Sequence, residues 1–223
     1  MPTAKPISIK VDDTQSVSAL LQVPPNAQVC YVLAHGAGAG MTHPFMVAVA
    51  NGLAERGMAT MRYQFPYMER GSKRPDAPPL AHATARAAVA AARKLVPDLT
   101  LIAGGKSFGG RMTSQAQASA PLDGVRGLAF LGFPLHPAKQ PSDSCAAHLL
   151  KIQVPMLFLQ GARDDLAHPS LLTSLIERLG ARARLSLFAD ADHSFHVPAR
   201  SGRKDADVLA EVLDVLVAWS DSM

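Results

Sequence analysis

The sequence predicts an α/β fold with a mostly parallel central sheet, helices on both of its faces and no large lid. Two observations predict this fold class. Strand patterns alternate with helix patterns along most of the 223 residues, and this order favours a parallel sheet that is covered on both faces. Glycine-rich turns directly follow predicted strands, and ligands bind beyond the carboxyl ends of the strands in such sheets. The functional residues are therefore expected at one edge of the sheet.

The strands are predicted from apolar runs that contain β-branched and aromatic residues. Residues 7–11 and 19–23 are expected to form two short leading strands, the second ended by Pro24 and Pro25. Residues 29–34 are apolar without interruption, which is typical of a strand buried on both faces. Further strands are expected over residues 58–63, 99–103, 125–131, 154–159 and 183–188.

Helices are predicted between these strands. Residues 44–56 begin at a proline and are followed by Gly57, the usual signals for a helix start and stop. Residues 80–96 are rich in alanine and end before Pro97. Later helices are expected over residues 109–119, 169–179 and 205–219, the last with a broad apolar stripe. Two stretches are predicted to be irregular: residues 64–79, and residues 133–152 with one short helix at 146–150.

Composition narrows the class of protein. Apolar residues make up 48% of the chain, enough for a sizeable core, and we expect a single domain over residues 1–223. The 22 basic and 18 acidic residues give a net charge of only +4, without the basic patch of a nucleic-acid binder. Cys30 and Cys145 show no zinc-ligand spacing. With no export or membrane-spanning segment predicted, we expect a cytoplasmic protein without nucleic-acid, membrane, metal or cofactor partners.

Two of the glycine-rich turns suggest nucleotide binding. Gly105-Lys106-Ser107 resembles the end of a phosphate-binding loop, but the earlier glycine of that motif would fall at Thr100, inside a predicted strand. The turn at 36–40 reads Gly-Ala-Gly-Ala-Gly after a strand, but the third glycine of a dinucleotide fingerprint would fall at Met41. Arg62 could still meet a 2′-phosphate, so an NADP-binding reductase is a minor alternative.

The turn Gly-Lys-Ser-Phe-Gly at 105–109 matches the G-x-S-x-G pattern of a nucleophile elbow. A serine between a strand and a helix takes a strained conformation that projects its hydroxyl, and the two glycines leave room where strand and helix nearly touch. The pattern follows a buried strand and precedes a predicted helix, as this arrangement requires. We therefore predict that Ser107 is a nucleophile.

A nucleophilic serine needs a base and an acid that orients the base, and the elbow motif belongs with the chain order Ser, Asp or Glu, His. His193 follows the strand at 183–188 and is the predicted base, with His196 in the same loop as the alternative. Asp164 follows the strand at 154–159 and is the predicted acid, with Asp165 as the competitor.

Two backbone amides are expected to stabilise an oxyanion: the N–H of Phe108, which follows the nucleophile, and that of Ala37 in the first glycine-rich turn. His35 is expected to order this turn and is one of four possible substrate contacts. The others, Tyr67, Arg70 and Arg74, lie in the irregular stretch 64–79. Either arginine could attract an anionic substrate group, although a solvated charged loop explains them as well.

Four motifs in order carry a family resemblance: Ala-His-Gly-Ala-Gly-Ala-Gly at 34–40, Tyr-Met-Glu-Arg-Gly at 67–71, Gly-Gly-Lys-Ser-Phe-Gly-Gly-Arg at 104–111 and Asp-His-Ser-Phe at 192–195. Together they resemble the small lidless α/β-hydrolases of the dienelactone-hydrolase clan, and most closely bacterial relatives of the third regulatory subunit of the animal NSL acetyltransferase complex. The resemblance covers nearly the whole chain and implies an α/β-hydrolase fold with the triad Ser107–Asp164–His193.

One departure bears on the substrate. Dienelactone hydrolases use a cysteine nucleophile, whereas position 107 is serine, which favours esters or related acyl substrates. The expected function is a serine hydrolase, most simply a carboxylesterase acting on small acyl esters through an acyl-enzyme. The animal relatives supply the alternative, a catalytically silent interaction protein with the same fold.

Overall fold

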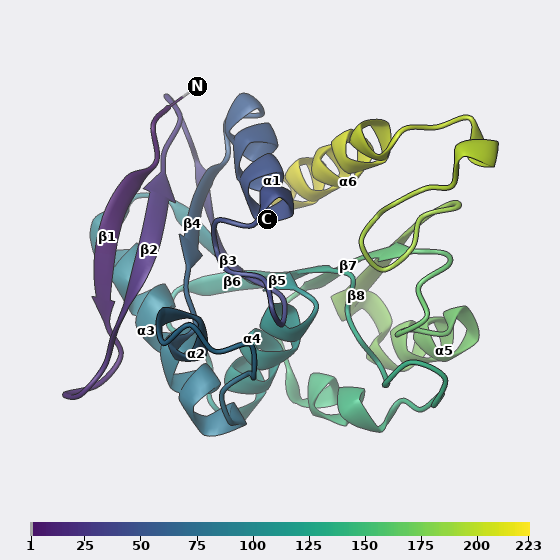
Figure 1. Ribbon diagram of the computed structural model, residues 1–223, viewed down its shortest axis with the longest axis horizontal. Coiled ribbons are helices and arrows are strands. Elements are labelled where there is room, and N and C mark those ends of the chain that lie inside the picture. Colours follow the sequence, from purple (N-terminus) through teal and green to yellow (C-terminus); the bar gives the residue numbers. More distant parts are fainter. Residues whose placement is uncertain (1) are drawn as a thin grey trace.

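The computed structural model describes residues 2–223. Its eight strands form one sheet in the order β1-β2-β4-β3-β5-β6-β7-β8 (Figure 1). β1 and β2 pair antiparallel, β2 and β4 pair antiparallel, and every pairing from β4 across to β8 is parallel. The strands are β1 (Lys5–Lys10), β2 (Ser16–Gln22), β3 (Val29–Ala34), β4 (Ala59–Tyr63), β5 (Thr100–Lys106), β6 (Val125–Leu131), β7 (Met156–Gly161) and β8 (Ala183–Phe188).

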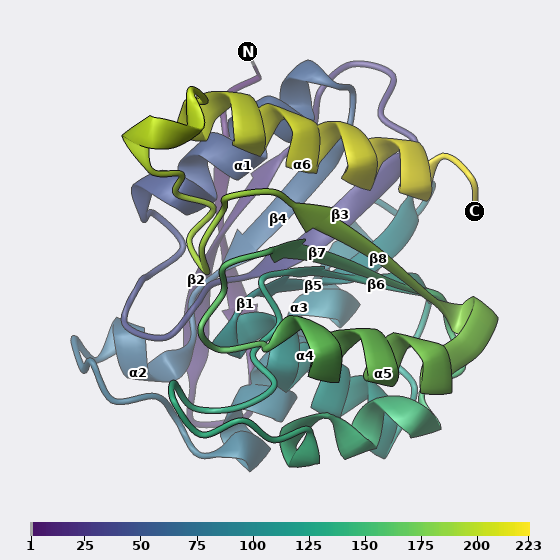
Figure 2. The same cartoon turned by 90° about the vertical axis from the view of Figure 1, so that its right-hand side faces the viewer.

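Helices cover both faces of this sheet. The helices are α1 (Pro44–Glu55), α2 (Pro66–Glu69), α3 (Pro78–Leu95), α4 (Phe108–Ser119), α5 (Pro169–Leu179) and α6 (Asp205–Ser220), with short 3₁₀ turns η1 (Ser144–Lys151), η2 (Gly180–Arg182) and η3 (Ala199–Ser201). α1 and α6 lie on one face, and α3, α4 and α5 lie on the other (Figure 2). This arrangement confirms the predicted fold class, and no large lid is built from the residues that the structure describes.

The side chains of β3 show why its sequence is apolar throughout. Tyr31 and Leu33 belong to the core under α1 and α6, whereas Cys30 and Val32 belong to the core under α3 and α4. Because side chains alternate between the faces of a strand, a strand with a core on each side cannot place a polar residue on either. The uninterrupted apolar run is thus the signature of a central strand.

The structure corrects the prediction at two places that matter for the site. Residues 64–79 are not wholly irregular, because α2 forms at Pro66 and buries Tyr67. β5 runs to Lys106 and not to residue 103, since Gly104 and Gly105 continue the ladder beside Leu33 and Ala34 of β3. Among residues 2–223, no helix combines the length and the apolar character that a bilayer crossing requires.

Candidate active site

The turns that follow the central strands converge at one edge of the sheet. Ser107 follows β5, Asp164 lies three residues after β7, and His193 lies in the segment after β8. The turn at 35–40 follows β3. Because all four strands are parallel, their carboxyl ends share an edge, and these segments meet there.

Ser107 takes an unusual backbone conformation, with φ 48° and ψ −114°. Positive φ is strained for a residue with a side chain, and it persists only where the surrounding structure holds it. A Cβ on Gly105 would lie 2.2 Å from the main-chain oxygen of Ala34, and one on Gly109 would lie 2.5 Å from that of His35. The two glycines of the motif therefore let β5 and α4 approach β3, and the turn between them carries Ser107.

Three side chains at this edge form a hydrogen-bonded series. The Nε2 atom of His193 lies 2.9 Å from Ser107 Oγ, and its Nδ1 atom lies 2.6 Å from Asp164 Oδ2. A carboxylate can only accept, so Nδ1 carries the hydrogen and Nε2 is free to accept the serine proton. The alternatives lie elsewhere: Asp165 is exposed, and the exposed His196 pairs with Asp205 at 2.8 Å.

Asp164 is held from several sides. It is only 3% exposed, and its carboxylate accepts hydrogen bonds from the Leu166 amide at 2.8 Å and from the Gln160 side chain. Gln160 is itself oriented, because its carbonyl oxygen accepts from the Phe133 amide at 2.8 Å. Sequence reasoning missed Gln160. Its signal was a polar residue at the end of the otherwise apolar strand β7.

Below the turn after β3, His35 is fully buried and bonded on both ring nitrogens. Nδ1 donates to the Gly36 carbonyl at 2.8 Å, and Nε2 accepts from the Phe65 amide at 3.0 Å. Burial lowers the pKa of His35 to about 4. The imidazole is therefore neutral and ties the turn to the segment after β4.

The side chains predicted as possible substrate contacts all lie outside the cavity beside Ser107. Tyr67 is buried, and its hydroxyl accepts from the Gly38 amide at 3.3 Å, so it supports the same turn as His35 from below. Arg70 is paired with Asp76 at 2.6 Å, and Arg74 is exposed in the following loop. The structure brings none of the four to the surface of that cavity.

The cavity beside Ser107 has a volume of about 450 Å³. Most of its surface is apolar, with Phe45, Met46 and Leu166 on its walls. Ala37 lines it together with Ser107, and Phe108 is the first residue of α4, where amide N–H groups have no partner within the helix. The cavity is lined by Gly36, Ala37, Ala39, His43, Phe45, Met46, Lys106, Ser107, Leu166, His193 and Ser194.

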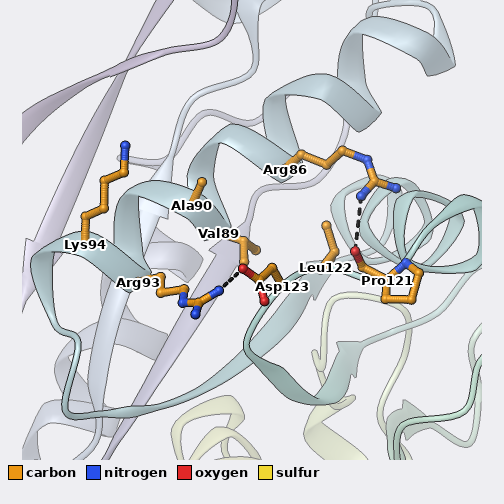
Figure 3. A pocket seen from close by; sticks show the side chains of 8 residues that line it. All are labelled: Arg86, Val89, Ala90, Arg93, Lys94, Pro121, Leu122 and Asp123. Carbon is orange, nitrogen blue, oxygen red and sulfur yellow. Dashed lines mark hydrogen bonds and ion pairs between the residues drawn. The ribbon is translucent and has the colours of Figure 1, made fainter.

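A second cavity, of about 470 Å³, lies at the opposite edge of the sheet, between α3 and the segment before β6 (Figure 3). Its arginines are already engaged. Arg93 pairs with Asp123, and Arg86 donates to the carbonyl of Pro121 and others at the end of α4. No serine, cysteine or histidine lines this cavity.

Comparison with known proteins decides the family. The profile of the alpha/beta hydrolase domain family matches residues 27–221. The chain belongs to this family. The NADP alternative required Arg62 at a binding surface. Arg62 is instead 3% exposed and donates to the Met41 carbonyl at 3.1 Å. The NADP-binding reductase is therefore dropped for this hydrolase-family chain.

Solved structures agree with the hydrolase fold. A dienelactone hydrolase from Anabaena variabilis is 22% identical, with a TM-score of 0.79 over 98% of this chain and 96% of that one. A serine hydrolase without a lid from Xanthomonas campestris is 21% identical, with a TM-score of 0.75 over 97% and 95%. An esterase domain from Rhodothermus marinus is 15% identical, with a TM-score of 0.72 over 98% of both chains. At these identities the likeness concerns the fold.

Proposed function

We propose that this hydrolase-family protein is a serine carboxylesterase that acts on small acyl esters through an acyl-enzyme. The observation that carries the proposal is the hydrogen-bonded series Ser107–His193–Asp164, with separations of 2.9 and 2.6 Å. Such a series activates a hydroxyl that is otherwise a weak nucleophile at neutral pH.

In the proposed reaction, His193 Nε2 takes the Ser107 proton as Oγ attacks the ester carbonyl carbon. The amides of Ala37 and Phe108 stabilise the oxyanion that forms. Collapse of this intermediate breaks the bond to the alkoxide, which leaves as the alcohol with the proton from His193. A water molecule then repeats the sequence on the acyl-enzyme, and the carboxylic acid is released.

Asp164 has a supporting part in this mechanism. It fixes the tautomer of His193 and stabilises the imidazolium that forms when Ser107 gives up its proton. The hydrogen bonds from Gln160 and Leu166 keep the carboxylate in place. Without these donors the buried carboxylate oxygens would lack partners, which is costly.

The cavity supports small acyl substrates. A volume of about 450 Å³ with apolar walls suits a short or compact acyl chain. The names of structural neighbours, a serine hydrolase and an esterase domain among them, support ester chemistry. We further propose a cytoplasmic setting and a small-molecule acyl partner, as the sequence suggested.

The interaction-protein alternative has less support. Positive φ at Ser107 costs of order 1–3 kcal/mol. The strained turn does place the Ser107 hydroxyl 2.9 Å from His193 Nε2. This combination favours a catalytic purpose over a purely structural one.

The proposal is tested by the hydrolysis of p-nitrophenyl acetate. We expect Ser107→Ala to lower kcat by at least about 10³-fold, because only binding and oxyanion stabilisation remain. Ser16→Ala is the matched control, since Ser16 is exposed at the start of β2 and lies outside the cavity. Its kcat should stay within about twofold of wild type. Equal activity of the wild type and Ser107→Ala would refute the proposal.

A further inference from the structure

Lys106 lies next to the nucleophile in sequence, but its side chain reaches a different loop. It is the last residue of β5, and its Nζ atom donates to the main-chain carbonyl of His193 at 2.5 Å. A Cβ on Gly132, the residue after β6, would lie 2.8 Å from this Nζ and 3.4 Å from His193 Cε1, so the lysine amine and the imidazole border the same glycine. One lysine thus joins the nucleophile elbow to the histidine loop.

The surroundings of Lys106 are unusual for an ammonium group. Nζ lies 6.0 Å from the centroid of the Phe45 ring and 5.8 Å from that of Phe195, and these rings stack on each other. Aromatic faces and a charge-assisted hydrogen bond together compensate for part of the lost hydration. Lys106 is half-buried, and lysines are rarely withdrawn from water without a partner, so this placement calls for a reason.

The loop that carries His193 is shaped by hydrogen bonds of its own and anchored to the segment after β7, where the Arg163 amide donates to the Ala191 carbonyl at 2.9 Å. The Asp192 carboxylate accepts from the amides of Ser194 at 2.7 Å and His196 at 3.0 Å, and Phe195 takes a positive φ of 62°. These bonds fix the shape of the turn and leave its distance from β5 to be set by other contacts. The bond from Lys106 to the His193 carbonyl spans that gap.

We propose that Lys106 is a positioning residue for the proposed reaction: its ammonium group holds the main chain of His193 so that Nε2 stays within reach of Ser107 Oγ. Because Lys106 and Ser107 are adjacent, the tether and the nucleophile move as one body. A displacement of about 1 Å at a reacting group can cost about 10²-fold in rate. This inference rests on the proposed serine hydrolase activity.

The tether should depend on pH. Burial lowers the pKa of Lys106 to about 8, although the carboxylates of Asp164 and Asp192 act in the opposite direction. The other titratable groups around it are His193 itself and His43, which lines the same cavity. Above pH 8 the group becomes a neutral amine, which is a weaker donor than an ammonium. Activity should therefore decline above this pH as the tether weakens.

The test uses Lys106→Met and Lys106→Arg and the rate of labelling by an alkyl fluorophosphonate from pH 6 to 10. Saturation curves separate the chemical rate constant kinact from the binding constant KI. Lys94→Met is the matched control, an exposed lysine near the end of α3 that lines the second cavity (Figure 3). Circular dichroism and the thermal midpoint check the fold of each variant.

We expect Lys106→Met to lower kinact by about 10- to 100-fold with KI within about twofold, and to lose the alkaline decline near pH 8. Lys106→Arg should recover part of kinact and move the decline upward, since arginine stays charged. Lys94→Met should match the wild type.

Three results would overturn the inference. The first is a Lys106→Met variant with the kinact and the pH profile of the wild type, and the second is a change in KI alone, which would make Lys106 a ligand of the probe. The third is an unchanged alkaline decline in Lys106→Arg. The last remains decisive if Lys106→Met does not fold. Failure of the proposed function is distinct, because the wild type would then not be labelled at Ser107, or labelling would be unaffected in Ser107→Ala.

Discussion

At the scale of single residues, the two adjacent acids after β7 have opposite environments. Asp164 is buried, accepts from Gln160 and Leu166, and contacts His193. Asp165 has the same chemistry and is exposed. Substitutions at these two positions therefore compare the loss of the carboxylate that contacts His193 with the loss of an exposed carboxylate next to it.

We predict that Asp164→Asn lowers kcat for p-nitrophenyl acetate by about 10³- to 10⁴-fold, because an amide cannot hold His193 in the tautomer that accepts the serine proton. Asp165→Asn is the matched control and should keep kcat within about twofold. The asparagine preserves volume, so the thermal midpoints of both variants should be compared. Similar losses in the two variants would contradict the assigned acid.

Several single residues could be predicted from the sequence because their motifs constrain them. Ser107, His193 and Asp164 follow strands in the order that the motif requires, and the structure brings these three together. Gln160 and Lys106 could not be assigned a partner in this way. Their roles depend on contacts with Phe133 and with the His193 carbonyl, which are distant in sequence. Tyr67 was expected as a possible substrate contact, but it is buried in α2, a helix that the sequence did not predict.

At the scale of elements, the approach of α4 to β3 depends on the missing side chain of Gly109. A Cβ there would press on the rigid main chain of Ala34 and His35. Gly52 in α1 is a useful contrast, since a Cβ there would meet Leu213 Cδ1, the end of a flexible side chain. Alanine improves helix propensity at Gly52, in the interior of α1, more than at Gly109, in the first turn of α4.

We predict that Gly109→Ala lowers the free energy of unfolding by at least about 2 kcal/mol, because the main chain must shift to relieve the overlap. Gly52→Ala should change it by no more than about 1 kcal/mol, since Leu213 can adopt another rotamer and the helix gains propensity. Urea unfolding measures both. The order of the two effects is the test, and a reversed order would contradict the packing described here.

Three strands and one helix match their predicted bounds: β3, β6, β8 and α5. Burial alone does not explain this, since β8 is an edge strand, whereas the fully buried β7 lies two residues later than predicted. The end of β5 was missed because Gly104 and Gly105 carry no apolar side chains, although their backbone pairs on both sides. α2 was missed because its four residues are too few for a helical repeat. Short elements depend on tertiary contacts, which a single sequence does not display.

At the scale of the whole molecule, buried neutral histidines link folding to pH. Burial lowers the pKa of both His35 and His148 to about 4, and for His148 the positive charge of Arg111 adds to this effect. The ordinary value for a histidine is about 6.5. Between these values the unfolded chain binds more protons than the folded one, so stability is full above about pH 6.5 and is lost as the pH falls toward 4.

We predict that the free energy of unfolding falls between pH 6.5 and 4.5, with each of the two histidines contributing up to about 1.4 kcal/mol per pH unit. The half-buried His148 contributes less than His35 because solvent screens it. His148→Gln should show a shallower slope, and His168→Gln, at an exposed position, should keep the wild-type slope. Urea titrations at several pH values measure this. Parallel slopes in the wild type and His148→Gln would contradict the assignment.

The central claim is that Ser107 is an activated nucleophile, and covalent labelling tests it most directly. The folded protein is incubated with an alkyl fluorophosphonate, digested, and searched by mass spectrometry for the modified peptide. The account predicts one phosphonyl adduct on Ser107, none in Ser107→Ala, and strongly slowed labelling in His193→Ala. A folded protein whose Ser107 stays unmodified, or whose labelling persists elsewhere in Ser107→Ala, would contradict it.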